Sequence, residues 1–180
     1  MSTLKSGDRG GPKTRRFPRV VLLFVTLAVL LDVAVWYLGK REYLAFLDIF
    51  TSSVVTGLIH LSGLQAHQDS NTIYLAHSVW VVTIECTAIQ IMTIYTAFVL
   101  AYPAAVRAKG LALLAGLPFI FGMNILRLWV MAWIDKLAPN FSTPFHNYVW
   151  QVAFIIMVIL MWLVWLEKVV KRESKSAVSP

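Results

Sequence analysis

Four long apolar runs constrain the fold of this chain more than any other feature of its sequence. They cover residues 20–38, 86–102, 111–134 and 148–166, and each is close to the roughly 20 residues that a helix needs to cross a bilayer. With 58% of its 180 residues hydrophobic, a soluble domain of this length could not bury its apolar surface. The sequence therefore predicts an all-α integral membrane protein with about four transmembrane helices.

Basic residues predict how these helices are oriented. If there are four spans and both termini are cytoplasmic, the basic residues that flank the runs fall on the cytoplasmic side. They are Lys5, Arg9, Lys13, Arg15, Arg16, Arg19, Arg107, Lys109, Lys168, Lys171, Arg172 and Lys175. The basic residues behind the net charge of +7 are thus placed as topology determinants of a protein in the cytoplasmic (inner) membrane. They do not form a nucleic-acid-binding face, so no nucleic acid is expected as a partner.

The segment between the first two spans is harder to place. Residues 42–64 are apolar but contain Asp48, Ser52, Thr56 and His60. Their spacing predicts an apolar stripe that suits an interfacial helix, formed by Tyr43, Phe46, Leu47, Phe50, Val54, Leu58 and Leu61. If this segment crossed the membrane, the basic residues after it would move outside, so the charge bias favours an interfacial helix on the outer surface over a further span. Short β-prone pieces at 72–75 and 79–83 indicate a possible small β-hairpin. Two roles are open for residues 65–84: they cover the functional site described below, or they bind a substrate motif.

The chain divides into one membrane domain and two tails. Residues 1–19 are rich in Gly, Pro, Lys and Arg and are expected to form a disordered, basic, cytoplasmic tail. Residues 20–170 form a single membrane-embedded domain, and residues 171–180 form a second basic cytoplasmic tail. The first apolar run has no small-residue cleavage site, so it is interpreted as an uncleaved anchor helix.

Three chemically active residues are expected at the outer end of this bundle. Cys86, the only cysteine, begins the second span, and His146 lies two residues before the last one. Arg127 lies seven residues before the end of the third span, about 10 Å from its outer end at 1.5 Å per residue. The guanidinium favours the thiolate and can hold a developing oxyanion, while the imidazole can shuttle a proton.

Arg127 is the least ambiguous of the three. An arginine inside an apolar helix costs about 2.5–3.5 kcal/mol on insertion scales, so it should face the bundle and have partners. Asn124 lies one turn earlier on the same face. Asp32 has a similar depth in the first span and is a candidate counter-ion. The alternatives are an arginine that only pairs helices or snorkels, and an aspartate that only makes a helix–helix hydrogen bond.

Cys86 and His146 each have an ordinary structural interpretation as well. A lone cysteine in an apolar helix is most often a small core residue, and histidines in loops are commonly just solvated. The position of Cys86 at the water boundary favours function, and Gln90 and Thr93 continue a polar stripe beneath it. Glu85 would oppose thiolate formation, so a structural role is assigned to it.

A metal site has little support in this sequence. The other histidines could in principle bind a metal together with Glu85 or Asp69, but no motif spacing supports such a site. These histidines are His60, His67 and His77. No metal and no organic cofactor are expected.

Three segments resemble the exosortase/archaeosortase family of multi-pass prokaryotic membrane proteins. They are "IECTAIQ", "FGMNILRLWVMAW" and "TPFHNYVWQ", and the resemblance covers about residues 71–166. It implies that Cys86 is a nucleophile assisted by Arg127 and His146. The small size and the "ECTAI" context are most similar to the short branch called exosortase H. The chain departs from the family in having Ala88 where glycine is common, Asn147 where an acid is common, and about half the usual number of spans.

The resemblance implies a cysteine transpeptidase or protease whose active site faces the outside or periplasm. Its substrates would be exported proteins that end in a short motif, a hydrophobic helix and a basic end. A Cys86 thioester would carry the substrate before its transfer or release, and water, a lipid amine or a glycan could be the acceptor. The alternative from the residues alone is a non-enzymatic scaffold or assembly subunit in which Arg127 and Asn124 lock helices together. A small transporter is disfavoured because no repeat is present.

Overall fold

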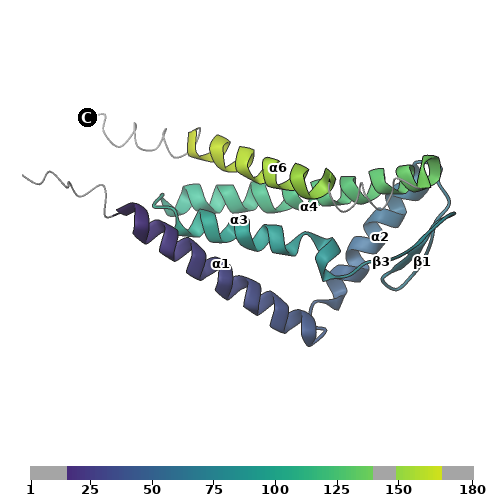
Figure 1. Cartoon of the computed structure of the whole chain (residues 1–180), viewed down its shortest axis with the longest axis horizontal. Helices are drawn as coiled ribbons and strands as arrows, with labels where there is room; N and C mark the ends of the chain where they lie inside the picture. The colour runs from purple at the N-terminus through teal and green to yellow at the C-terminus, as the bar shows by residue number, and fades with distance from the viewer. Residues whose placement is uncertain (1–15, 140–148, 168–180) are drawn as a thin grey trace, which may run out of the picture.

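The chain folds into a bundle of helices with a small sheet at one end (Figure 1). The computed structural model describes residues 16–139 and 149–167. In these ranges the helices are α1 (Arg16–Lys40), α2 (Ala45–Leu61), α3 (Ile89–Ala101), α4 (Val106–Leu137) and α6 (Trp150–Trp165), with a short 3₁₀ helix η1 (Ile84–Thr87) before α3. The strands are β1 (His67–Asp69), β2 (Thr72–Tyr74) and β3 (Val79–Val81).

The four helices that contain the predicted spans run lengthwise beside one another. α1 packs along α3, α3 packs on α4, and α4 packs on α6. The start of α1, the turn between α3 and α4 and the end of α6 lie at one end of the bundle, while α2 and the sheet lie at the other (Figure 1). This arrangement is the one that a four-span topology with both termini on the same side requires.

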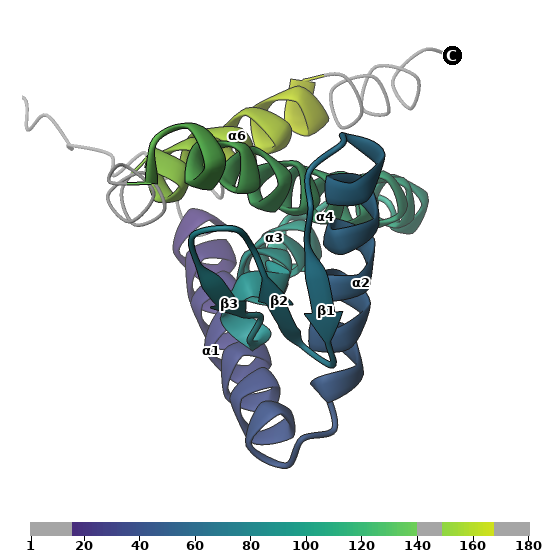
Figure 2. The same cartoon turned by 90° about the vertical axis from the view of Figure 1, so that its right-hand side faces the viewer.

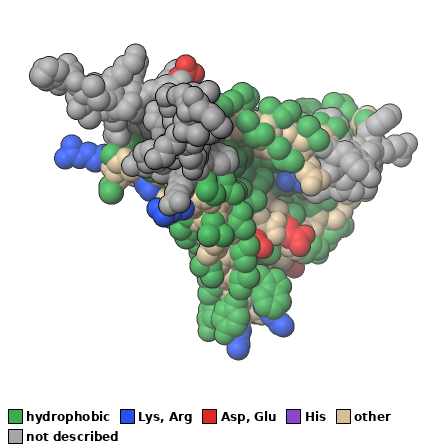
Figure 3. Space-filling view, turned by 60° about the vertical axis from the view of Figure 1, so that its left-hand side comes forward, with side chains coloured by type: hydrophobic (Ala, Val, Ile, Leu, Met, Phe, Trp, Pro, Cys, Tyr) green, Lys and Arg blue, Asp and Glu red, His purple; other side chains and the backbone are tan. Residues whose placement is uncertain are grey.

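Two of the described helices are long and apolar enough to cross a membrane by themselves. They are the stretch Pro18–Lys40 of α1 and the 32-residue α4, whereas α2, α3 and α6 are apolar but shorter. Hydrophobic side chains cover the outward face of α1, with Lys and Arg at the ends of that face (Figure 3). Leu22, for example, is 69% exposed. The chain therefore presents a membrane-facing surface, and the count of four spans remains a prediction.

The helix α2 buries one face and exposes most of its large apolar side chains on the other. Thr51, Ser52 and Ile59 are buried, whereas Phe46 and Leu61 are exposed. The buried side packs against α4 and η1, so the apolar stripe predicted for residues 42–64 faces away from the protein. A helix with such an outward apolar face suits the membrane surface.

The sheet covers the end of the bundle next to α2 (Figure 2). Its order is β1-β2-β3 and all pairs are antiparallel, with Ile73 opposite both Gln68 and Trp80. Gln68 ties β1 to α2, because its Nε2 donates to the Ser52 Oγ at 2.8 Å. β2 and β3 lie within the segment expected to form a hairpin, while β1 was not predicted.

Two apolar clusters hold the bundle together. The first joins α2, the sheet and the second half of α4 around Ile59, Ile73 and Leu128. The second joins α3, the first half of α4 and α6 around Tyr95, Ile120 and Trp165. Cys86 packs against the first cluster and Ala88 belongs to the second, so the chain passes from one cluster to the other within three residues.

Candidate active site

Four elements enclose a pocket of about 600 Å³ that contains both Cys86 and Arg127. η1 contributes Cys86, α4 contributes Arg127, and α3 and α6 form the two walls. The lining residues are Glu85, Cys86, Gln90, Ile91, Ile94, Arg127, Gln151, Phe154, Ile155, Val158, Ile159 and Trp162. The two residues are 41 positions apart in the sequence, and the fold alone brings them to one pocket.

Cys86 lies in the 3₁₀ turn that precedes α3. The sequence predicted that the second helix starts at Cys86, which is wrong, because α3 begins at Ile89. The Cys86 N–H donates to the Thr83 carbonyl at 2.7 Å, and its Sγ lies 3.8 Å from the Thr83 Oγ1. The side chain is partly exposed. The thiol is thus held on a tight turn at the helix entrance, with a hydroxyl group beside it.

The strands fix where this turn begins. The Val82 N–H donates to the Asn71 carbonyl at 2.8 Å, and the Asn71 Nδ2 donates back to the Val82 carbonyl at 2.9 Å. These two bonds hold the chain between β3 and η1, four residues before Cys86. Residues 65–84 therefore anchor the segment that carries the thiol.

Ala88 has a left-handed backbone conformation, with φ 61° and ψ 11°. This conformation costs about 1–2 kcal/mol for a residue with a Cβ and nothing comparable for glycine. It lets the chain end the 3₁₀ turn and start α3 in a new direction. An alanine at this position therefore forms the turn at the cost of backbone strain.

Asn124 fixes the turn from the side of α4. It is only 1% exposed, and its Nδ2 donates to the Cys86 carbonyl at 2.6 Å. This bond satisfies a backbone acceptor in the turn and joins η1 to α4. Asn124 was expected to share the face of Arg127, and in the structure it contacts the residue that bears the thiol.

Arg127 reaches the pocket one turn after Asn124. Its Cζ lies 5.8 Å from the centre of the Phe154 ring on α6, a geometry typical of a cation–π contact. The side chain is half-buried. Arg127 therefore borders both the thiol and the wall that α6 provides.

Of the residues predicted to support the three candidate catalytic residues, some line the pocket and others lie elsewhere in the bundle. Gln90 lines the pocket. Thr93 is buried, and its Oγ1 donates to the Gln90 carbonyl at 2.7 Å. Asp32 is exposed on α1 and does not line the pocket. No ion pair joins it to Arg127 in the described part of the chain, because α1 packs mainly on α3. The expectation of an Asp32 counter-ion is therefore not met.

His146 lies outside the described residues, as do Asn147 and most of the "TPFHNYVWQ" segment. Gln151, five residues later in the sequence, lines the pocket. Sequence reasoning overlooked Gln151, Thr83 and Phe154. Gln151 stood in a quoted motif, and Thr83 lies three residues before the cysteine. Phe154 had no signal, because nothing in a uniformly apolar run shows which face meets an arginine.

The remaining histidines have other contacts. The His60 Nε2 lies 2.7 Å from the Ala66 carbonyl oxygen, and the His67 ring lies 6.0 Å from that of Tyr74. His77 lines a separate pocket beside Asp135. Across the described ranges, no group of three or more His, Cys, Asp or Glu residues could hold a metal ion.

In this bundle of apolar helices, a thiol and a guanidinium share one pocket. The fold and the pocket are those of a helical membrane protein with a candidate nucleophilic site. The family model described as transmembrane exosortase (Exosortase_EpsH) matches residues 9–163. The chain therefore belongs to the transmembrane exosortase family. No curated protein and no solved structure matches the chain.

Proposed function

We propose that this chain is a cysteine transpeptidase or protease that cleaves a C-terminal sorting signal from exported proteins. The observation that carries the proposal is the pocket shared by Cys86 and Arg127. Family membership supports the same chemistry, since Cys86 and Arg127 lie at the motif positions expected for it. The proposed location is the inner membrane, with the pocket on the outer side and both termini in the cytoplasm.

In the proposed reaction, His146 takes the proton of the Cys86 thiol, and the thiolate attacks the scissile carbonyl carbon. Arg127 stabilises the oxyanion of the tetrahedral intermediate. The C–N bond then breaks, His146 protonates the departing amine, and the acyl group remains on Cys86 as a thioester. An acceptor that has lost a proton to His146 attacks this thioester and releases the thiolate. No metal or organic cofactor takes part in these steps.

The surrounding residues have positioning roles in this proposal. Asn124 and Thr83 hold the turn that carries the thiol. Glu85 is exposed at the pocket edge, where water screens its charge. The Phe154 ring orients the Arg127 guanidinium. The thiol lies at the entrance of α3, the depth at which a peptide bond just outside a membrane helix would reach it.

Replacement of Cys86 tests the proposal. In cells that naturally carry the chain, Cys86→Ala should leave exported proteins with uncleaved C-terminal tails, as measured by mass spectrometry of their C-termini. The variant should still insert and accumulate normally.

Arg127→Gln should reduce the rate by about 10²–10³-fold, because it removes an oxyanion donor. A thioester between Cys86 and a tail-bearing protein should form in the unsubstituted chain, where hydroxylamine would release the acyl group, and should be absent from Cys86→Ala.

The same variants discriminate against a scaffold. If Arg127 and Asn124 only lock helices, Arg127→Leu should disrupt assembly while Cys86→Ala has no effect. Unchanged processing in the Cys86→Ala strain, with the protein present at its normal level, would refute the enzymatic proposal.

A further inference from the structure

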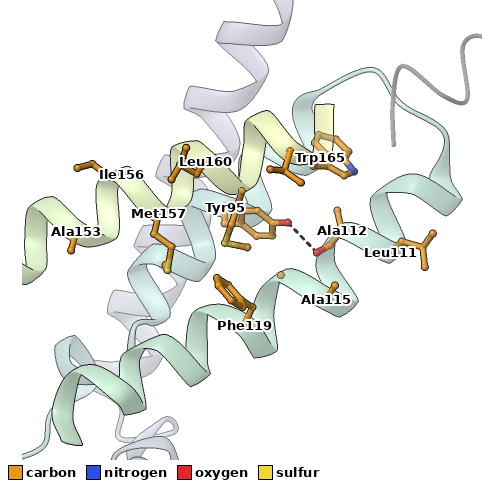
Figure 4. A pocket seen from close by; sticks show the side chains of 13 residues that line it. Tyr95, Leu111, Ala112, Ala115, Phe119, Ala153, Ile156, Met157, Leu160 and Trp165 are labelled. Atoms are coloured by element: carbon orange, nitrogen blue, oxygen red, sulfur yellow. Dashed lines mark hydrogen bonds between the residues drawn. The ribbon is translucent and has the colours of Figure 1, made fainter. Parts of the chain in front are cut away.

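Two apolar cavities flank α6 on opposite faces. The first is the pocket described above, here called the thiol groove. The second, here called the α4–α6 cavity, has a volume of about 980 Å³ and is lined on the α6 side by Ala153, Ile156, Met157 and Leu160 (Figure 4). Adjacent residues of α6 therefore face different cavities, Ile155 the thiol groove and Ile156 the α4–α6 cavity.

The thiol groove changes from polar to apolar along its length. Its polar residues are Glu85, Cys86, Gln90, Arg127 and Gln151. From there α3 contributes Ile94 and α6 contributes Ile155, Ile159 and Trp162, all apolar on their groove side. Gln151 and Trp162 are 11 residues apart on one helix, which corresponds to about 16 Å. The groove thus leads from the thiol along the bundle for about half the thickness of a hydrocarbon core.

The apolar walls of the thiol groove are open. Ile155 is 55% exposed, Ile159 is 46% exposed and Ile94 is 45% exposed. Something apolar must cover them in the membrane, and the groove ends at a nucleophile. A peptide that reaches the thiol from within the bilayer must be helical where it lies in hydrocarbon, because its backbone groups have no other hydrogen-bonding partners there.

We infer that the thiol groove binds the hydrophobic helix of the substrate, with the scissile bond at Cys86 and the first three turns of the helix against Ile94, Ile155 and Ile159. This inference rests on the proposed function. The occupant is assigned by continuity, since the same cavity holds the nucleophile and the apolar walls. The groove length fits about 11 helical residues, and the rest of the substrate helix lies in lipid beyond Trp162.

The α4–α6 cavity lacks the features that would make it the substrate site. Among the described residues, no charged side chain and no thiol line it. The Tyr95 hydroxyl at its wall already donates to the Ala112 carbonyl at 3.0 Å (Figure 4), and the Trp165 Nε1 donates to the Ala108 carbonyl at 3.2 Å. A scissile bond in this cavity would have no nucleophile or oxyanion donor beside it.

Matched substitutions on adjacent residues of α6 test the assignment. Ile155→Trp fills the thiol groove, whereas Ile156→Trp fills the α4–α6 cavity, and the two isoleucines are similarly exposed at 55% and 52%. Ile159→Trp and Leu160→Trp form a second pair with the same difference. Each groove variant should lower processing of tail-bearing exported proteins by about tenfold or more, equivalent to 1.4 kcal/mol of binding. Each cavity variant should stay within about twofold of wild type.

Crosslinking provides an independent measurement of occupancy. A photoreactive residue at position 159 should crosslink to the hydrophobic segment of the uncleaved substrate in the Cys86→Ala variant, and the same residue at position 160 should not. Equal effects of the paired tryptophans, a larger effect of the cavity variants, or crosslinks from position 159 to lipid alone would overturn the inference. The Cys86→Ala strain separates the two proposals, because processing that persists there refutes the enzymatic function itself.

Discussion

Asn124 connects the chemistry of the thiol to the framework of α4. Its side chain is almost fully buried, and its Nδ2 donates a hydrogen bond to the Cys86 carbonyl at 2.6 Å. Helical spacing predicted that it shares a face with Arg127. The contact with the cysteine could not be predicted, because it depends on how η1 crosses α4.

Replacement of Asn124 should displace the thiol. In Asn124→Asp the shape is kept, but an acceptor faces the Cys86 carbonyl, and a buried unpaired group costs about 1–3 kcal/mol. We expect a lower thermal stability in detergent together with a changed rate of Cys86 alkylation by N-ethylmaleimide. Restoration of both by Asn124→Gln would favour a hydrogen-bonding role. An unchanged alkylation rate in Asn124→Asp would show that the bond does not position the sulfur.

The residues of the candidate site differ in how far the sequence could predict them. Cys86 and Arg127 were found because a lone thiol at a helix entrance and a charge inside an apolar run are rare and costly. Asp32 does not line the pocket, because a similar depth in the membrane does not determine which helices are neighbours. The left-handed Ala88 was recognised only as a departure from the family, since alanine itself gives no signal for a positive φ.

At the level of elements, α3 and α4 approach each other closely at Gly116. A Cβ at this position would collide with the ring of Tyr95, whose hydroxyl donates to the Ala112 carbonyl at 3.0 Å. The absence of a side chain therefore lets Tyr95 lie flat against α4. This contact holds the helix that follows the thiol against the helix that carries Arg127.

Gly116→Ala should weaken this packing. We expect a loss of about 1–3 kcal/mol, the usual cost of overpacking, measured as a lower midpoint of thermal unfolding in detergent. Gly122→Ala on the same helix is the matched control, because its added Cβ meets open space and alanine is the better helix former by about 1 kcal/mol. A stability loss shared equally by both variants would contradict the packing argument.

The boundaries of the elements were predictable only where the sequence has a residue that stops a helix. Pro103 ends the second apolar run, and α3 ends at Ala101. By contrast, α4 begins at Val106 rather than near residue 111, since the basic residues Arg107 and Lys109 are part of the helix. The outward apolar face of α2 followed from its spacing. The strand β1 did not, because its "HQD" sequence has no β-branched or aromatic residue and is held by pairing with β2.

At the scale of the whole molecule, the topology makes a prediction about access to the thiol. With both termini cytoplasmic, Cys86 lies on the outer side, so a membrane-impermeant maleimide should label it in intact spheroplasts. Cys86 is the only thiol, and Cys86→Ala therefore provides a clean background. Labelling that appears only after lysis would contradict the outward placement and, with it, the proposed delivery of exported substrates.

The overall arrangement was largely accessible from the sequence. Apolar runs and flanking charges predict lengthwise helices whose first and last members begin and end on the same side, and in the fold the start of α1 and the end of α6 lie at one end (Figure 1). The pairing of α1 with α3, and the two cavities beside α6, could not be read from hydropathy. Uniformly apolar helices do not reveal which of their faces meet protein and which meet lipid.

The shortness of α3 has a consequence for the lipid around it. Its 13 residues rise only about 20 Å, some 10 Å less than the hydrocarbon thickness of a typical bilayer. If α3 crosses the membrane, the acyl chains beside it must compress to relieve this hydrophobic mismatch. This local thinning of the bilayer brings water and headgroups close to the Cys86 sulfur. The length of the lipid chains would therefore govern how readily a polar acceptor reaches the sulfur.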